Sequence, residues 1–202
     1  VNSGTLDAFA TASGLAEGMK ISDASFTNQK GGILNLTVKS NQTVWQDGLA
    51  GGISIAPNSN VVNAGTINID MESHAHFIKG FSFGDKSSTL TNTGTIKILG
   101  TNFGDGTHVK EPTLKDTKNA YGMYLNDGEK FANDGTLIIG VNALKGVSMG
   151  IAAHDAEIAN NAGGKMNITV KAYEQEAFGI DVYGASGCGN NAGTISFDAT
   201  AG

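Results

Sequence analysis

Residues 92–100 read Asn-Thr-Gly-Thr-Ile-Lys-Ile-Leu-Gly, and the same phrase recurs along the whole chain. Including this one, the chain of 202 residues contains seven copies, two of which carry one extra residue before the apolar alternation. The close copies begin at Asn2, Asn63, Asn92, Asn133 and Asn191, and the looser ones at Asn28 and Asn160. A short phrase repeated this often marks a repeat protein, so the repeating unit decides the fold.

Each copy joins a turn signal to a strand signal. Asn-x-Gly supplies residues that tolerate a positive φ, and the following Thr-Ile-x-Ile alternates polar and apolar side chains of high β propensity. In the copy at Asn92 we expect Ile96 and Ile98 to point into a core, and Thr95 and Lys97 to face water. The equivalent inward pairs are Leu34/Leu36, Ile67/Ile69, Leu137/Ile139, Met166/Ile168 and Ile195/Phe197.

Two further signals lie between the copies. One is the phrase Gly-apolar-x-apolar, which begins at Gly18, Gly52, Gly80, Gly122, Gly150 and Gly179. The other is one apolar residue two positions before the anchor asparagine: Phe26, Val61, Leu90, Phe131, Ile158 and Cys188, the last counted from Asn190. The segment from glycine to anchor asparagine keeps a nearly constant length, whereas the segment from asparagine to the next glycine varies widely. Such a unit is a coil of three short strands with insertions along one side.

Coils of this kind cannot bury their apolar residues alone, but stacked coils form one continuous core with parallel ladders between turns. The sequence therefore predicts an all-β fold, a single-stranded parallel β-helix (solenoid) of about six full turns plus a partial seventh. We expect residues 1–202 to form a single domain, a segment of a longer solenoid, with insertions at residues 39–51 and 100–121.

Composition and charge exclude several classes of function. The formal net charge is −6, and all 13 basic residues are lysines. Recognition of phosphates and base edges relies on the guanidinium of arginine, so we expect no nucleic-acid binding. The single cysteine, Cys188, cannot form an internal disulfide and is expected to be a small buried apolar residue. The chain shows no signal peptide and no run of 18 apolar residues, but we interpret it as an excised segment, so this says little about localisation.

The two insertions are the best candidates for a recognition surface. They lie two turns apart in the variable half of the repeat, so we expect them to emerge on the same side and to contact each other. Trp45, Phe103 and Tyr121 are the aromatic residues that we expect to contact a ligand. Two alternatives stay open: Trp45 packs against the flank of the rod, and the insertions project from a tolerant scaffold without binding anything.

Catalytic and metal-binding patterns are weak. His74 and His76 would share one face of an extended segment, but Glu72 alone does not complete a site, so we expect no metal. Asp155 and Asp181 could lie on adjacent turns, although carboxylates at turns are usually solvated. The glycine-rich segments do not open helices, so they lack the helix terminus that binds phosphate. We predict that the protein is not an enzyme and uses no cofactor.

The Asn-x-Gly-Thr-Ile strand, alternating with a Gly-Ile-x-Val strand, resembles the β-helical passenger domains of Gram-negative autotransporters (type V secretion) over residues 2–198. The resemblance implies a cell-surface or released protein, associated with the outer membrane, whose β-helix is the scaffold of an adhesin. The implied partner is a glycan or protein on a host-cell or bacterial surface, with self-association through the faces or ends of the β-helix as a further interaction. Membrane attachment would depend on the family's translocator barrel, which is not part of this sequence.

No catalytic residue of that family maps onto the chain. The competing hypothesis is a polysaccharide-processing β-helix enzyme or a tailspike-like glycan-binding protein, because parallel β-helices also carry such functions. A third is a structural stalk without a ligand. A glycan array combined with a depolymerisation assay separates these three.

Overall fold

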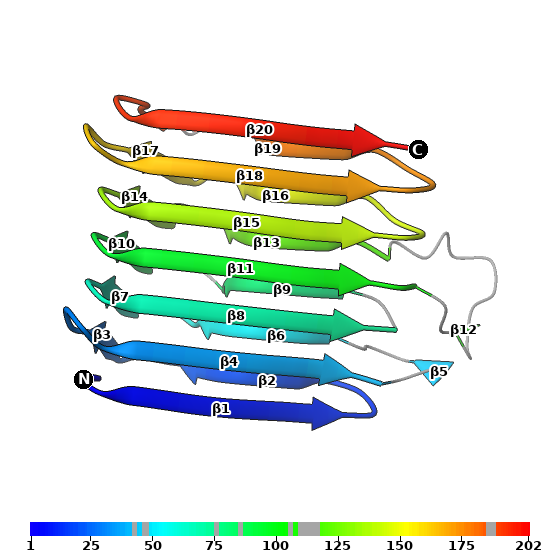
Figure 1. The fold of residues 1–202 in the computed structure, drawn as a ribbon, viewed down its shortest axis with the longest axis horizontal. Helices are drawn as coiled ribbons and strands as arrows, with labels where there is room; N and C mark the ends of the chain where they lie inside the picture. Colours follow the sequence, from blue (N-terminus) through cyan, green and yellow to red (C-terminus); the bar gives the residue numbers. More distant parts are fainter. Residues whose placement is uncertain are drawn as a thin grey trace.

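The chain winds into about six stacked turns, and corresponding strands of successive turns form three parallel β-sheets (Figure 1). The structure is a computed structural model that describes residues 1–41, 44–45, 49–74, 77–84, 87–104, 107–108, 118–184 and 189–202, with 44–45 and 107–108 described by their backbone alone. The described residues form strands, turns and bends, and none of them lies in a helix. The predicted all-β parallel β-helix is therefore confirmed.

Seven strands of eight residues form the sheet that we call the long sheet, and each comes from a different turn. In spatial order they are β1 (Thr5–Ala12), β4 (Ile33–Ser40), β8 (Thr66–Ser73), β11 (Thr95–Asn102), β15 (Thr136–Ala143), β18 (Lys165–Ala172) and β20 (Thr194–Ala201). All neighbours are parallel and in register, so Thr95 lies between Thr66 and Thr136. The repeated Thr-Ile-x-Ile phrase forms the first half of these strands.

The other two sheets complete each turn. The short sheet has strands of four residues: β3 (Ser25–Asn28), β7 (Asn60–Asn63), β10 (Thr89–Asn92), β14 (Lys130–Asn133) and β17 (Glu157–Asn160). The bent sheet contains β2 (Ala16–Ile21), β6 (Leu49–Ile55), β9 (Phe77–Phe83), β13 (Ala120–Asn126), β16 (Ser148–His154) and β19 (Ala177–Tyr183).

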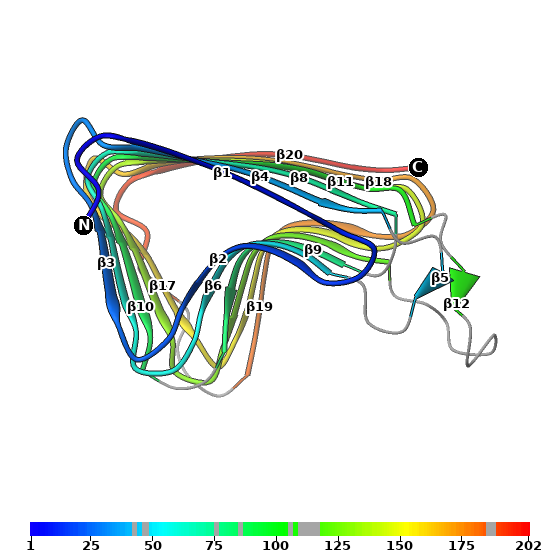
Figure 2. The same ribbon diagram turned by 90° about the horizontal axis from the view of Figure 1, so that it is seen from below.

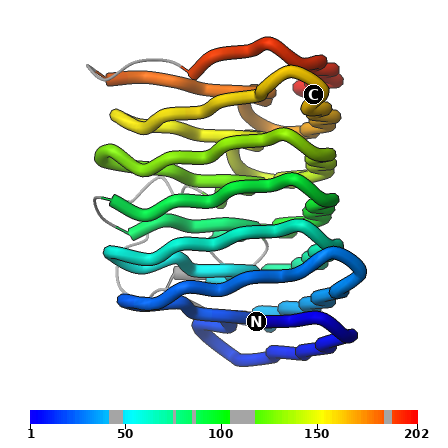
Figure 3. Tube along the Cα trace, turned by 90° about the vertical axis from the view of Figure 1, so that its left-hand side faces the viewer, coloured from blue at the N-terminus to red at the C-terminus, as the bar shows by residue number. Residues whose placement is uncertain are grey.

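Successive turns superimpose when the molecule is viewed along its axis (Figure 2). The long sheet forms one nearly flat side, and the short and bent sheets close the coil opposite it. From the side, each coil lies on the preceding one, from the N-terminal end to the C-terminal end of the stack (Figure 3). Side chains at equivalent positions of the repeat therefore form columns parallel to the axis.

The core follows the predicted alternation. Ile96 and Ile98 are fully buried, and the equivalent pairs in β4, β8, β15 and β18 are buried as well. Lys97 is exposed on the outer face of the same strand. In the last turn Phe197 is 52% exposed, because no further turn of the described chain lies on it. Burial of each large apolar side chain contributes about 1.5–3 kcal/mol, so the stacked columns are the main source of stability.

The repeated glycine of the second phrase marks the bend in the bent sheet. The ladder between β6 and β9 pairs Gly51 with Lys79 and Ile53 with Phe81, and passes over Gly52. A Cβ added at Gly52 would lie 2.5 Å from the carbonyl oxygen of Gly80 and from a methyl carbon of Ile69 in the long sheet. Glycine is therefore required where the two sheets approach each other most closely.

The anchor asparagines form a buried ladder inside the coil. The side-chain Nδ2 atoms of Asn28, Asn63, Asn92 and Asn133 each donate to the Oδ1 of the next asparagine at 2.8 Å. Nδ2 also donates to backbone carbonyls at the turn, for example from Asn63 to the oxygen of Thr95 at 3.0 Å. These hydrogen bonds satisfy the buried amides and hold every turn in the same register.

The last copy of the repeat corrects one prediction. Asn160 donates to Asn191 at 2.9 Å and forms a β-bridge with it, so the anchor of that turn is Asn191 and not Asn190. The position two residues before the anchor is then Gly189. Cys188, for which we predicted an inward position, lies outside the described residues.

The strands extend into the segments that we predicted as insertions. β4 continues to Ser40 and β6 begins at Leu49, within the predicted insertion at 39–51. β11 continues to Asn102 and β13 begins at Ala120, within the predicted insertion at 100–121. The segments that connect the long sheet to the bent sheet in these two turns are therefore 41–48 and 103–119.

Candidate functional site

The two insertions pair with each other outside the coil. β5 (Val44–Trp45) and β12 (Thr107–His108) form a small parallel sheet in which Thr107 faces Val44 and His108 faces Trp45. Figure 2 shows this sheet beside the edge where the long and bent sheets are connected. The expected contact between the insertions is thus present, although the side chain of Trp45 lies outside the described residues.

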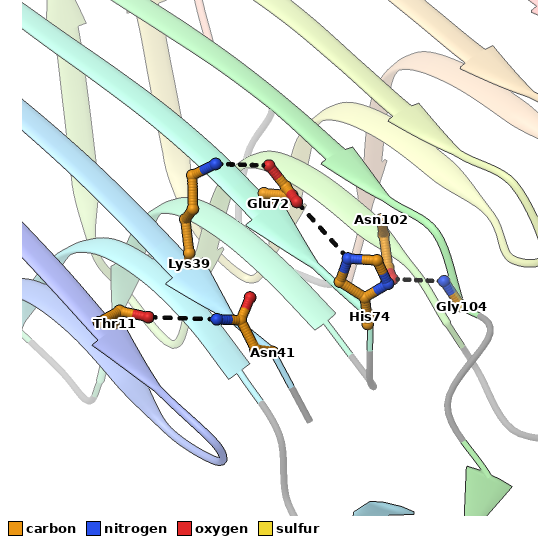
Figure 4. A network of polar contacts seen from close by, with 7 residues as sticks. All are labelled: Thr11, Lys39, Asn41, Glu72, His74, Asn102 and Gly104. Carbon is orange, nitrogen blue, oxygen red and sulfur yellow. Dashed lines mark hydrogen bonds and ion pairs between the residues drawn. The ribbon is translucent and has the colours of Figure 1, made fainter. Parts of the chain in front are cut away.

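Hydrogen bonds hold the two ends of the longer insertion against the coil, and Figure 4 draws the one between Gly104 and Asn102. The backbone N–H of Gly104 donates to Oδ1 of Asn102 at 3.1 Å, and Nδ2 of Asn102 donates to the carbonyl of Asn119 at 3.1 Å. Lys118 Nζ donates to the carbonyl of Gly104 at 2.6 Å. The insertion therefore leaves and rejoins the coil at one fixed place.

Phe103 lies beside this place and stacks on His74. The ring centroids are 4.7 Å apart, and the ring planes are inclined by 15°. His74 directly follows β8, and Phe103 directly follows β11, so the stack joins two successive turns. Phe103 is half-buried and retains an exposed part at the base of the insertions.

A charged group continues the same edge. Lys39 and Glu72 are register neighbours on β4 and β8, and their side chains form an ion pair of 2.9 Å. Nε2 of His74 lies 3.5 Å from the other oxygen of Glu72 (Figure 4). The hydrogen bond from Lys39 holds the pKa of Glu72 below its ordinary value of 4.5, and the positive charge of Lys39 acts in the same direction.

This ion pair gives a testable titration. A lowered pKa in the folded state means that Glu72 stabilises the fold above its unfolded pKa, and that this contribution is lost as the pH falls through the lowered value. An NMR titration of the Glu72 carboxyl is expected to show a midpoint below 4.5. Lys39→Met should raise the midpoint towards 4.5, whereas Lys97→Met should leave it in place. An unchanged midpoint in Lys39→Met would contradict the attribution of the lowered Glu72 pKa to Lys39.

Tyr121 lies in a different cluster, on the bent sheet. It is only 8% exposed, and its hydroxyl accepts a hydrogen bond of 2.8 Å from Nδ2 of Asn119. Its ring packs edge-on against Tyr124 at 5.2 Å, and the Lys79 ammonium lies 4.0 Å from the centre of the Tyr124 ring. Burial raises the pKa of Tyr121 and lowers that of Lys79. Tyr121, one of the three aromatic residues predicted to contact a ligand, therefore exposes only a small part of its side chain.

Comparison with known proteins gives no assignment by similarity. None of the protein-family models, curated proteins or solved structures compared with the chain matches it. Within the part of the chain that the structure describes, no helix could span a membrane. The functional hypotheses therefore rest on the surface features themselves.

The outer face of the long sheet carries hollows that the sequence reasoning did not single out. One hollow of about 350 Å³ is lined mainly by polar side chains, among them Asn35, Asn68, Asp70 and Lys97. A second of similar volume shares Asp70 and Leu99 with it and continues towards Thr101 and Lys171. Because outward side chains form columns, polar residues at alternate positions of successive copies are the sequence signal for such a face.

A second missed group lies at the corner between the bent and short sheets. Asp127, His154 and Asp155 each place a ligand atom within 4.8 Å of the others. Asp127 and Asp155 each follow the bend glycine, Gly122 or Gly150, by five residues, and counting from these glycines would have placed them together. The sequence instead suggested Asp181 as the neighbour of Asp155, but Asp181 pairs with Ala152 in the ladder.

Proposed function

We propose that this chain is a non-enzymatic β-helix scaffold of a cell-surface or secreted protein, an autotransporter-like adhesin segment. The observation that carries the proposal is the pairing of β5 with β12. Stacking of the coils does not need this pairing, because regular turns such as β18–β19 connect the same two sheets through residues 173–176 alone. Segments that a scaffold does not need, yet holds in a fixed arrangement, are typical recognition elements.

The chemistry of the paired insertions suits adhesion. At the base of the insertions the half-buried ring of Phe103 stacks on His74, and His74 lies beside the ion pair of Glu72 with Lys39. An aromatic surface bordered by charged and hydrogen-bonding groups fits a glycan or a protein on a host-cell or bacterial surface. The only tryptophan of the chain, Trp45, lies on β5, in the two-stranded sheet that the insertions form.

Secretion and the solenoid are compatible. Each turn templates the next through backbone pairing, so the rod can form progressively as a chain emerges outside the cell. The single cysteine excludes an internal disulfide that would have to form during transport. These arguments support a location at the cell surface or outside the cell.

Removal of the insertions tests the recognition surface. Replacing residues 42–48 and 105–117 each by Gly-Gly removes β5 and β12 but keeps the strands of the coil. We expect unchanged β-sheet circular dichroism and loss of binding to host cells and to a glycan array. The matched control is Glu174→Ala/Glu176→Ala, which alters a regular turn on the same edge and should retain binding. Undiminished binding after the double replacement would refute the assignment to the insertions.

The long-sheet hollows favour a second candidate, glycan binding on the outer face of the rod. Amide, carboxylate and ammonium groups of Asn68, Asp70 and Lys97 can hydrogen-bond sugar hydroxyls, and Leu99 offers an apolar contact. Asp70→Asn/Lys97→Met should abolish glycan binding on this hypothesis and leave it intact on the first. Release of shorter oligosaccharides from a bound polysaccharide would instead indicate an enzyme.

A further inference from the structure

Three potential metal ligands from two successive turns meet at the corner between the bent and short sheets. Asp127 lies between β13 and β14, His154 ends β16, and Asp155 follows it. One ligand atom of each lies within 4.8 Å of the other two. Nε2 of His154 is 3.4 Å from Oδ2 of Asp155. The cluster thus combines two carboxylates with an imidazole nitrogen.

The backbone holds these groups in a fixed arrangement. The N–H of Asp127 donates to the carbonyl of His154 at 2.9 Å, and the N–H of Gly128 donates to the carbonyl of Asp155 at 2.7 Å. The His154 ring stacks on Tyr183, with centroids 4.3 Å apart. Paired backbone and a stacked ring are the kind of support that orients metal ligands.

The same corner is built differently in earlier turns. There Nδ2 of Asn58 donates to Oδ1 of Asp23 at 3.2 Å, and the hydroxyl of Ser87 donates to Oδ1 of Asn58 at 3.1 Å. The carboxylate of Asp23 thus has an amide as its neighbour in the next turn, and that amide has a hydroxyl as its neighbour in the turn after. In the later turns Asp127 and Asp155 bring two carboxylates together, and within the described ranges no lysine forms an ion pair with Asp127. A cation between the two carboxylates would remove their repulsion.

We propose that Asp127, His154 and Asp155 bind a divalent transition-metal ion, with zinc as the best match, and that the ion joins two successive turns. Oxygen and imidazole nitrogen are donors that zinc accepts. With metal–ligand bonds of about 2.0–2.2 Å, two ligand atoms of a tetrahedral zinc are ~3.3 Å apart. The pair formed by His154 and Asp155 already has this separation, and the exposed Asp127 side chain can rotate to close the third side. A fourth position remains for water or a group from a partner.

Calorimetric titration of the EDTA-treated chain with zinc chloride tests the site, with stoichiometry from native mass spectrometry. The proposal expects one zinc ion per chain at micromolar affinity. His154→Gln and Asp155→Asn should each weaken binding at least tenfold, and excess Mg²⁺ should not compete, because it disfavours imidazole. His74→Gln is the matched control, since His74 also lies beside a carboxylate, that of Glu72, but Lys39 already pairs with that carboxylate.

Two further readouts keep the outcome independent of any effect on folding. In NMR spectra, zinc should shift or broaden the His154 ring resonances and leave those of His74 unchanged. The zinc-bound chain should also melt about 5 °C higher at a large excess over the dissociation constant, and His154→Gln should remove this increase. Failure of the wild-type chain to bind zinc, or retention of tight binding in His154→Gln, would overturn the proposal.

Discussion

Gly52→Ala is expected to destabilise the solenoid by about 3 kcal/mol, because the bend has no room for a methyl group. The new Cβ would lie 2.5 Å from the carbonyl oxygen of Gly80, a backbone atom of the next turn, and equally close to a methyl carbon of Ile69. The first neighbour is backbone, and the second is the branch methyl of a buried β-branched side chain. Relief therefore requires β6 to move away from the next turn and from the long sheet. Urea unfolding followed by circular dichroism should show a clearly lower midpoint.

The adjacent glycine provides the control. A Cβ added at Gly51 would meet its nearest neighbour, Cγ of Glu17, at 3.5 Å, which is an ordinary contact. Gly51→Ala should therefore change the free energy of unfolding by no more than about 0.5 kcal/mol. Equal losses in the two variants would show that the penalty comes from the general strand conformation, and not from the close approach at Gly52.

Periodicity explains why the coil could be predicted from the sequence. Thr95, Ile96 and Ile98 belong to a phrase that returns in every turn, so their orientation could be deduced by comparing copies. The last three residues of the same strand, 100–102, do not repeat in sequence and were assigned to an insertion. Backbone pairing with both neighbouring turns extends this strand, and that pairing depends on the stacked structure.

The candidate sites were less predictable, because they depend on contacts between non-repeated residues. The expected meeting of the two insertions followed from their common position in the repeat. The burial of Tyr121 did not, since Tyr121 lies in β13 of the bent sheet and packs on Tyr124 and Lys79. Prediction of the cluster of Asp127 with Asp155 would have required the register of two successive corners, which their backbone hydrogen bonds set.

Asn92→Ala is expected to cost about 3 kcal/mol, because it interrupts the buried asparagine ladder in the middle. Nδ2 of Asn63 would lose its acceptor, and Oδ1 of Asn133 would lose its donor, each at 2.8 Å in the intact ladder. Both groups are fully buried, so water cannot replace the missing amide without opening the turn. Thermal and urea unfolding measure the loss.

An asparagine pair on the outer face separates this effect from the loss of any amide hydrogen bond. Nδ2 of Asn68 donates to Oδ1 of Asn35 at 2.8 Å, the same length as in the buried ladder, but on the solvent side of the long sheet. Asn68→Ala should cost less than about 1 kcal/mol, because water solvates the remaining Asn35 oxygen. If both substitutions cost the same, burial of the ladder contributes nothing beyond the hydrogen bond itself. A large loss confined to Asn92→Ala instead identifies the buried amides as the groups that hold neighbouring turns in register.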